Sequence, residues 1–243
     1  MSQPKLVLYQ YPGLSRSATL SPPCGKVQMA LRFKGLDFEI HNLRTPGEVR
    51  KVNLRGRVPA LKIGDELIAD STDVLHALEA RFPDPPLDPA DPQQRLEALL
   101  WEDWADECLY FYGVYLRWMT EESFEAMRRN VFARQPWPLR AIIPGIAKRL
   151  VRRRLKGQGT GDKPPEVVWR EFRDALDRVD ARLDGRDFLV GDALSRADLA
   201  VVSICDQLMS DVLPPGLHAE LEPRPRLRAW RERVHALVPS AAG

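Results

Sequence analysis

Two short stretches of this chain carry residue types that could bind a small zwitterionic molecule. In residues 56–61 (GRVPAL) a proline stands just before a predicted strand, where it has no N–H to give to a central sheet ladder. The Val58–Pro59 bond is expected to be cis, which would leave the backbone of Val58 free to pair with a ligand. Asp70-Ser71 opens a predicted helix and so joins a carboxylate to a helix N-terminus. That combination suits a ligand with both an ammonium and a carboxylate group.

Ser21 is the first candidate for activating a thiol. Serine followed by Pro22 and Pro23 is a strong helix-start signal, with serine as the N-cap and proline at the first helical position. The Ser21 oxygen is expected to accept a backbone N–H while its own proton points at a bound sulfur. A hydroxyl donor at the positive end of a helix favours a thiolate, since a free thiol has a pKa of roughly 8.5. The alternative is that Ser21 only caps the helix.

Cys24 and Tyr11 are alternative candidates for the same chemistry. Cys24 occupies the second cysteine position of a C-x-x-C motif whose first position is Ser21, so it cannot close an internal disulfide there. A thiol in the first turn of a helix can have a lowered pKa and form a mixed disulfide, but a residue at this place more often points into the core. Tyr11 ends the first predicted strand and is the reserve thiol activator. Packing is the alternative role for Tyr9 and Tyr11.

The composition is that of an ordinary globular chain with one large or two modest domains. The 243 residues are 44% hydrophobic and 29% charged, and the net charge of +2 gives no reason to expect nucleic acid as the main partner. An odd number of widely spaced cysteines (Cys24, Cys108 and Cys205) indicates a reducing compartment. The N-terminus leads straight into a strand pattern, and no apolar run approaches the ~20 residues of a membrane span. The expected location is the cytoplasm.

Strands and helices are predicted to alternate in the first third of the chain. The strands are expected at 5–11, 37–43, 60–63 and 66–69, the last two joined by a Gly64-Asp65 turn. Helices are expected at 21–34 and from Ser71 to just before Pro83, with a short helix or turn at 46–53. The proline-rich segment 83–93 is typical of a linker. The remainder is predicted to be helical, over residues 94–119, 121–134, 139–156, 165–184, 196–213 and 223–237.

This order of elements, with its VPAL and DS motifs, resembles the thioredoxin-like N-terminal domain of cytosolic glutathione transferases. The resemblance continues through the linker to FLVGDALSRADLAV (188–201), which is similar to the family's buried capping box, with Ser195 and Asp198 in structural roles. It covers roughly residues 5 to 237. It implies the glutathione transferase fold, with an α/β thioredoxin-like N-terminal domain and an all-α C-terminal domain. The implied boundaries are 1–83 for the glutathione-binding domain, 84–91 for the linker and 92–243 for the helical domain with the hydrophobic substrate site.

The resemblance implies a serine-type glutathione transferase that uses glutathione as co-substrate, needs no metal and forms a homodimer. Ser21 stands where the family has its catalytic Ser or Cys. Val58 would pair with the cysteinyl part of glutathione, and Asp70, where many relatives have the longer Glu, would hold the γ-glutamyl end together with Ser71. The implied glutathione site consists of Arg57, Val58, Pro59, Asp70 and Ser71.

The second substrate is expected to be an apolar electrophile, in the manner of a detoxification enzyme. The predicted helix over 94–119 carries aromatic residues and a cysteine at 3–4 spacing on one face, a pattern that is more often core than pocket. In the family the N-terminal part of this helix faces the cleft. The expected pocket residues are Tyr11, Trp104, Cys108 and Tyr112.

Two features leave alternatives open. The loop over 12–20 is longer than in most relatives and resembles a metaxin-like branch, several of whose members are not known for transferase activity. The alternatives are therefore a non-catalytic binding module or a glutathione-dependent disulfide reductase that uses Cys24. The segment 148–156 (KRLVRRRLK) follows an apolar run and could form a basic amphipathic helix that contacts an anionic membrane or an acidic partner. A solvated helix face is the simpler interpretation.

Overall fold

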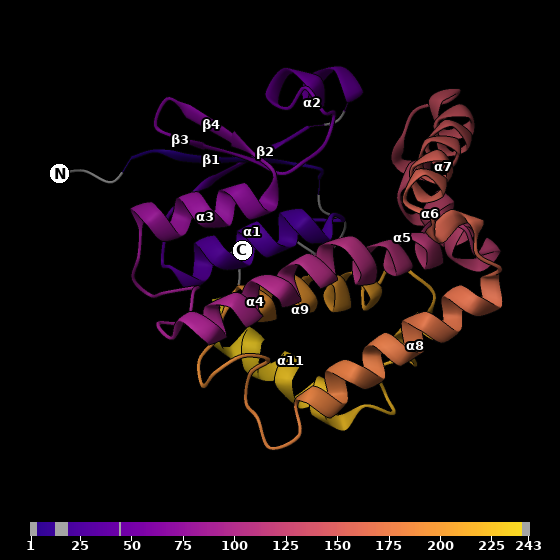
Figure 1. Cartoon of the computed structure of the whole chain (residues 1–243). Helices are drawn as coiled ribbons and strands as arrows, with labels where there is room; N and C mark the ends of the chain where they lie inside the picture. The colour runs from indigo at the N-terminus through magenta and orange to yellow at the C-terminus, as the bar shows by residue number, and fades with distance from the viewer. Residues whose placement is uncertain (1–3, 13–18, 44, 240–243) are drawn as a thin grey trace. The chain divides into compact units, whose positions relative to one another are not determined.

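A four-stranded mixed sheet, of order β2-β1-β3-β4, is the framework for the predicted binding residues (Figure 1). Strand β1 (Leu6–Gln10) pairs in parallel with β2 (Glu39–Asn42) and antiparallel with β3 (Ala60–Ile63). Strand β4 (Glu66–Ala69) completes a hairpin with β3. Gly64 lies in the two-residue turn of that hairpin with φ +60°, a conformation that glycine adopts readily. The bounds predicted for β3 and β4 are confirmed.

The computed structural model describes residues 4–12, 19–43 and 45–239, and the chain forms two compact units. The first unit comprises 1–102, 186–203 and 230–243, and the second comprises 103–185 and 204–229. Each unit therefore contains segments that lie far apart in the sequence. Helices α4, α9 and α11 each begin in one unit and end in the other.

Three helices accompany the sheet in the first unit. Helix α1 (Pro22–Phe33) packs against α3 (Ser71–Arg81), and Figure 1 shows α2 (Pro46–Val52) on the other side of the sheet. Local capping fixes the helix starts: Thr45 Oγ1 accepts a hydrogen bond from Glu48 N at 3.2 Å at the start of α2. The segment predicted as a short helix or turn at 46–53 is thus a capped helix.

The predicted helix over 94–119 is interrupted in its middle. It consists of α4 (Pro92–Trp104), a five-residue π-helical turn η1 (Ala105–Leu109), and α5 (Tyr110–Trp118). A π turn inserts an extra residue per turn, so the face predicted from a regular 3.6-residue period does not continue across it. The single continuous stripe predicted for this helix is therefore wrong.

The remaining helices have the bounds α6 (Glu121–Asn130), α7 (Leu139–Gln158), α8 (Pro165–Arg182), α9 (Arg196–Leu208), α10 (Pro215–His218) and α11 (Pro225–Leu237). Short 3-10 turns η2 (Phe132–Arg134) and η3 (Thr160–Asp162) flank α7. In the second unit α5 packs against α6, α7 and α8. Among the described residues, no helix has both the length and the apolar character needed to cross a membrane.

Candidate functional site

The Val58–Pro59 peptide bond is cis, as predicted. Within the described parts of the chain, neither the N–H nor the C=O of Val58 forms a hydrogen bond. The preceding loop is fixed by Asn53, whose Nδ2 donates to Arg57 O at 3.0 Å and whose O accepts from Gly56 N at 2.8 Å. Both polar groups of the Val58 main chain therefore remain available at the start of β3, on a loop that is held in place.

The helix of the Asp70-Ser71 pair begins where predicted. Asp70 is the N-cap of α3, and its Oδ1 accepts from Thr72 N at 3.1 Å. Asp70 N donates to Pro59 O at 3.3 Å, which brings the exposed Asp70 carboxylate beside the Val58–Pro59 turn. Ser71 is buried as the first residue of the helix. The structure thus brings together four of the residues that the sequence singled out.

Asp70 has an unusual backbone, with φ 100° and ψ 138°. Such a conformation costs a non-glycine residue about 1–3 kcal/mol, and strain of this kind concentrates at functional sites. An aspartate occupies this position although a glycine would adopt this φ without the penalty. The positive φ therefore makes Asp70 a candidate functional residue.

Ser21 is the N-cap of α1, but its side chain makes no capping hydrogen bond. The prediction that its oxygen accepts a backbone N–H is wrong: Pro23 at the second helical position has no N–H to donate, and no capping bond forms with the third position, Cys24, either. The Ser21 hydroxyl lies near the Cys24 thiol, where it acts to lower the pKa of that thiol. Ser21 N donates to Thr19 Oγ1 at 3.2 Å, and Thr19 Oγ1 donates to Tyr11 O at 3.1 Å.

Cys24 is fully buried in a small apolar cluster with Leu43, Val49 and Val58. Burial raises the pKa of its thiol to about 12, despite hydrogen-bond contacts with Ser21, Tyr11 and Thr19 that act in the opposite direction. The interpretation of Cys24 as a residue that points into the core is therefore confirmed. Because Cys24 and Val58 share one cluster, the start of α1 lies close to the Val58–Pro59 turn.

Two further predicted residues lie at the edges of this region. Arg57 is exposed directly before Val58, and Tyr11 follows β1 with an exposed side chain. Tyr11 is tied to Ser21 through Thr19, so the two alternative thiol activators are neighbours. Residues 13–18 of the loop between them lie outside the described residues.

The other predicted pocket residues belong to the second unit. Trp104 ends α4, Cys108 lies in the π turn η1, and Tyr112 lies on α5; all three are partly exposed. Burial and the Glu171 carboxylate raise the pKa of Tyr112 to about 12. Lys163 Nζ lies 2.6 Å from Glu171 Oε2, so Tyr112 belongs to a polar group that keeps it neutral.

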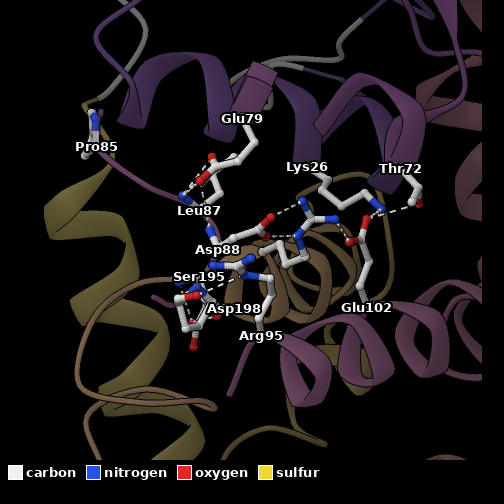
Figure 2. A network of polar contacts seen from close by, with 12 residues as sticks. Lys26, Thr72, Glu79, Pro85, Leu87, Asp88, Arg95, Glu102, Ser195 and Asp198 are labelled. Atoms are coloured by element: carbon white, nitrogen blue, oxygen red, sulfur yellow. Dashed lines mark hydrogen bonds and ion pairs between the residues drawn. The ribbon is translucent and has the colours of Figure 1, made fainter. Parts of the chain in front are cut away.

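A buried ionic network supports both helix starts of the site (Figure 2). Lys26 on α1 lies 2.8 Å from Glu102 Oε1, and Thr72 Oγ1 on α3 donates to the same oxygen at 3.0 Å. Arg196 on α9 lies 3.1 Å from Glu102 Oε2 and forms a second ion pair with Asp88. One carboxylate thus connects the helix that begins after Ser21 with the helix that begins after Asp70.

Sequence reasoning missed this network. Its partners are separated by up to 108 positions, and only proximity in the fold relates them. The one available signal was a lysine within the mostly apolar run CGKVQMAL, since a buried lysine requires a paired charge.

A second buried carboxylate confirms half of the predicted capping box. Asp198 Oδ2 accepts from Ser195 N at 2.9 Å, as predicted, while the Ser195 hydroxyl donates to Asp198 rather than accepting a backbone N–H. Asp198 Oδ1 accepts from Leu189 N at 2.9 Å and from Trp230 Nε1 at 2.8 Å. Burial raises the pKa of Asp198 despite these donors. Its role in the structure is to join two segments of the first unit, 186–203 and 230–243.

No group of three or more His, Cys, Asp or Glu side chains suited to a metal ion occurs in the described residues. Side chains that could hold an organic ligand are those around Val58 and Asp70, which offer main-chain groups, a carboxylate and a helix N-terminus.

Comparison with known proteins identifies the family. A model of the glutathione S-transferase N-terminal domain matches residues 22–123, and a model of the glutathione S-transferase C-terminal domain matches residues 150–237. Protein LigF of Sphingobium sp. is 30% identical over 203 residues, which cover 77% of this chain and 73% of LigF. The chain therefore belongs to the glutathione S-transferase family, and the predicted fold is confirmed.

The crystal structure of beta-etherase LigF has a TM-score of 0.65 to this chain at 27% identity, with 96% and 95% of the two chains covered. The isoprene-epoxide glutathione S-transferase of Rhodococcus sp. is 25% identical over 219 residues, covering 88% of this chain and 91% of the enzyme. Human metaxin-1 is 26% identical over 194 residues, but these cover only 40% of metaxin-1.

Proposed function

We propose that this glutathione transferase holds glutathione along the Val58–Pro59 turn and the start of α3, and that Ser21 stabilises its thiolate. The observation that carries the proposal is the hydrogen bond between Asp70 N and Pro59 O. It joins an available peptide edge to a carboxylate at a helix N-terminus, which are the two recognition elements that a γ-glutamyl peptide requires.

The roles of the binding residues follow from their chemistry. The N–H and C=O of Val58 pair with the cysteinyl residue of glutathione, as a strand edge pairs with an extended peptide. The Asp70 carboxylate receives the γ-glutamyl ammonium, while Ser71 and the first N–H groups of α3 receive its carboxylate. Arg57 is exposed beside this edge and pairs with the terminal carboxylate of the peptide.

Ser21 performs the activation step. Its side chain makes no capping hydrogen bond, and its contact with the Cys24 thiol can be exchanged for one with a bound sulfur. A donor at the N-terminus of α1 stabilises the thiolate over the thiol and lowers the pKa of the bound glutathione. Cys24 is unsuited to this role because its pKa of about 12 keeps it protonated at neutral pH. The same property disfavours a disulfide reductase that would use Cys24.

The second substrate is an apolar electrophile, and the candidate residues for its pocket are Tyr11 in the first unit and Trp104, Cys108 and Tyr112 in the second. The names of two relatives, a beta-etherase and an isoprene-epoxide transferase, support ethers and epoxides as classes to test. In both, the thiolate attacks carbon, the C–S bond forms as the C–O bond breaks, and the oxygen that leaves takes a proton from water.

The protein is further proposed to be a cytoplasmic homodimer that acts in detoxification. Three free cysteines support a reducing compartment. Leu96 and Leu100 lie one turn apart on α4 with exposed side chains, and Leu67 on β4 is exposed as well. Such apolar groups are typical of a surface that another subunit covers. We also propose that residues 1–83 form the glutathione-binding domain, 84–91 the linker and 92–243 the helical domain.

Calorimetric titration with reduced glutathione tests the proposal. Binding in the micromolar to low-millimolar range, weakened in Asp70→Asn, would support the site and justify assays with epoxides and ethers. An absence of heat and of thermal stabilisation at several millimolar glutathione would contradict it and favour the non-catalytic binding module.

A further inference from the structure

The segment around α7 has a charge distribution unlike that of the rest of the chain. Residues 126–161 contain ten Lys and Arg and no Asp or Glu. Because the whole chain carries +2, the other residues together carry −8. A single-sign run of this size attracts an anionic partner and repels a second copy of the same surface.

One side of α7 is fixed to the second unit. Leu155 and Pro144 are buried, and Gln158 Nε2 donates to Glu107 O at 2.9 Å. Lys148 Nζ lies 3.9 Å from the centre of the Phe124 ring, and Arg154 lies over the Tyr110 ring. These contacts determine which face of the helix packs inward.

The opposite side of α7 is apolar and exposed. Ile142, Ile146 and Leu150 follow one another at intervals of four residues and are 52–60% exposed. At 3.6 residues per turn, this spacing places them on one narrow stripe of the helix. Leu139 extends the stripe toward the helix start, and Trp137, just before the helix, is 75% exposed. Isolated surface leucines are common, but a continuous apolar stripe on a surface helix indicates a binding face.

Basic side chains border this stripe. Arg149, Arg152, Arg153 and Lys156 are all exposed in the last turns of α7. Arg149 follows Ile146 by three positions, and Arg153 follows Leu150 by three. Both arginines therefore lie on the same side of the helix as the apolar stripe. Long basic side chains can cover apolar surface while their charges reach an anionic layer beyond it.

We propose that α7 and Trp137 form a docking surface for an anionic phospholipid bilayer. A helix with an apolar stripe, an adjacent basic rim and a tryptophan at its end suits the interface between headgroups and acyl chains. The apolar stripe inserts at the level of the acyl boundary, and the basic rim pairs with lipid phosphates. A nucleic acid would use the charges but leave the apolar stripe in water.

Flotation of the full chain with vesicles tests the proposal. The protein should float with vesicles that contain both phosphatidylcholine and phosphatidylglycerol, and should not float with vesicles of phosphatidylcholine alone. It should dissociate from the anionic vesicles as the salt concentration is raised. Each basic residue near an anionic surface strengthens binding roughly fivefold. The variant R149Q/R152Q/R153Q should therefore bind on the order of a hundredfold more weakly.

Two matched control variants distinguish binding through the α7 surface from a general effect of losing charge or exposed apolar side chains. R50Q/K51Q/R228Q removes the same charge from exposed positions outside α7 and should float like the parent chain. I146S/L150S should lose flotation, while L54S/L237S, which changes two exposed leucines elsewhere, should retain it. Thermal unfolding checks that every variant is folded.

A second readout uses the tryptophan. Anionic vesicles should shift the fluorescence of the parent chain to shorter wavelength, and the shift should disappear in W137F. Failure of the parent chain to float with anionic vesicles would overturn the proposal. Equal flotation of R149Q/R152Q/R153Q and the parent would do so too, as would binding to an acidic protein or RNA in place of vesicles.

Discussion

Lys26 Nζ lies 2.8 Å from Glu102 Oε1, and only 1% of either side chain is exposed. The pair connects α1 to α4, and Glu102 also accepts from Thr72 on α3 and from Arg196 on α9. The helices that begin after Ser21 and Asp70 are thus held by one carboxylate with three donors. The positions of the two helix starts at the candidate site therefore depend on a network whose side chains are not among the proposed glutathione-binding residues.

Removal of one member of the pair should be strongly destabilising. Lys26→Met leaves the Glu102 carboxylate buried with one cation fewer, and loss of a partner from a buried pair costs about 3–5 kcal/mol. The double variant Lys26→Met/Glu102→Gln should be less destabilised than the sum of the two single variants. Urea unfolding of the four proteins measures the coupling, and strictly additive effects would show that the two side chains do not interact.

The same carboxylate should make stability depend on pH in the acid range. Burial by itself would raise the pKa of Glu102, but Lys26 and Arg196 hold it below its ordinary value of 4.5. Since the folded pKa is lowered, ionised Glu102 stabilises the fold above pH 4.5, and this contribution disappears as the pH falls through the folded pKa. The stability difference between the parent chain and Glu102→Gln should therefore be largest near neutral pH and shrink in acid. The free energy of unfolding of both proteins, measured across this pH range, tests the prediction. A stability difference that does not change with pH would contradict it.

Ser21→Ala should lower turnover while leaving glutathione affinity nearly intact. Loss of one preorganised donor to a developing anion reduces kcat by about 10²–10³, and the pKa of bound glutathione should rise. Because the Ser21 side chain makes no capping bond, the melting temperature should change little. The ultraviolet absorbance of the bound thiolate, titrated against pH, is the direct readout. An unchanged titration would transfer the role to Tyr11.

Asp70 can be tested with two substitutions that differ in backbone preference. Asp70→Asn keeps a good N-cap but removes the charge, so glutathione should bind roughly 10–100-fold more weakly at nearly unchanged stability. Asp70→Gly also removes the charge but relieves the positive φ, so it should be at least as stable as Asp70→Asn. Calorimetric titration and thermal unfolding measure the two effects separately. Retention of full affinity in both variants would remove Asp70 from the site.

The cysteines should differ sharply in reactivity. Cys24 and Cys205 are buried, Cys108 is partly exposed, and the pKa of Cys24 is raised to about 12. Native alkylation at neutral pH should therefore modify Cys108 and spare the other two, while all three react in denaturant. Peptide mass spectrometry identifies the sites. Rapid native labelling of Cys24, or a glutathione adduct on it, would revive the reductase alternative.

The residues that bind glutathione in the proposal could be found from sequence because they lie in local motifs. The cis bond at Pro59, the helix start at Asp70 and the hairpin around Gly64 each depend on a few consecutive residues. Such features are encoded by short-range backbone preferences, which a single sequence displays.

What could not be predicted depends on distant partners or on small changes of period. The π turn at 105–109 differs from a regular helix by one residue per turn, too little to alter an apolar pattern visibly. The missing cap at Ser21 is a second case, because Pro23 has no N–H to donate at the second helical position although a proline near the helix start is otherwise a favourable signal. The partners of Lys26 only become neighbours once the whole first unit has assembled.

Arg196 on α9 donates to Glu102, so the network that holds α1 and α3 includes a residue from a late part of the chain, and Asp198 next to it accepts in turn from Trp230 on α11. During synthesis the ribosome delivers α1 and α3 long before these partners emerge. The nascent amino-terminal half must therefore wait, with Lys26 and Glu102 lacking Arg196, until almost the entire polypeptide has left the exit tunnel. A fragment that ends before Arg196 would leave Glu102 without one of its two cations, so the support of the candidate site is complete only once a late part of the chain has been synthesised.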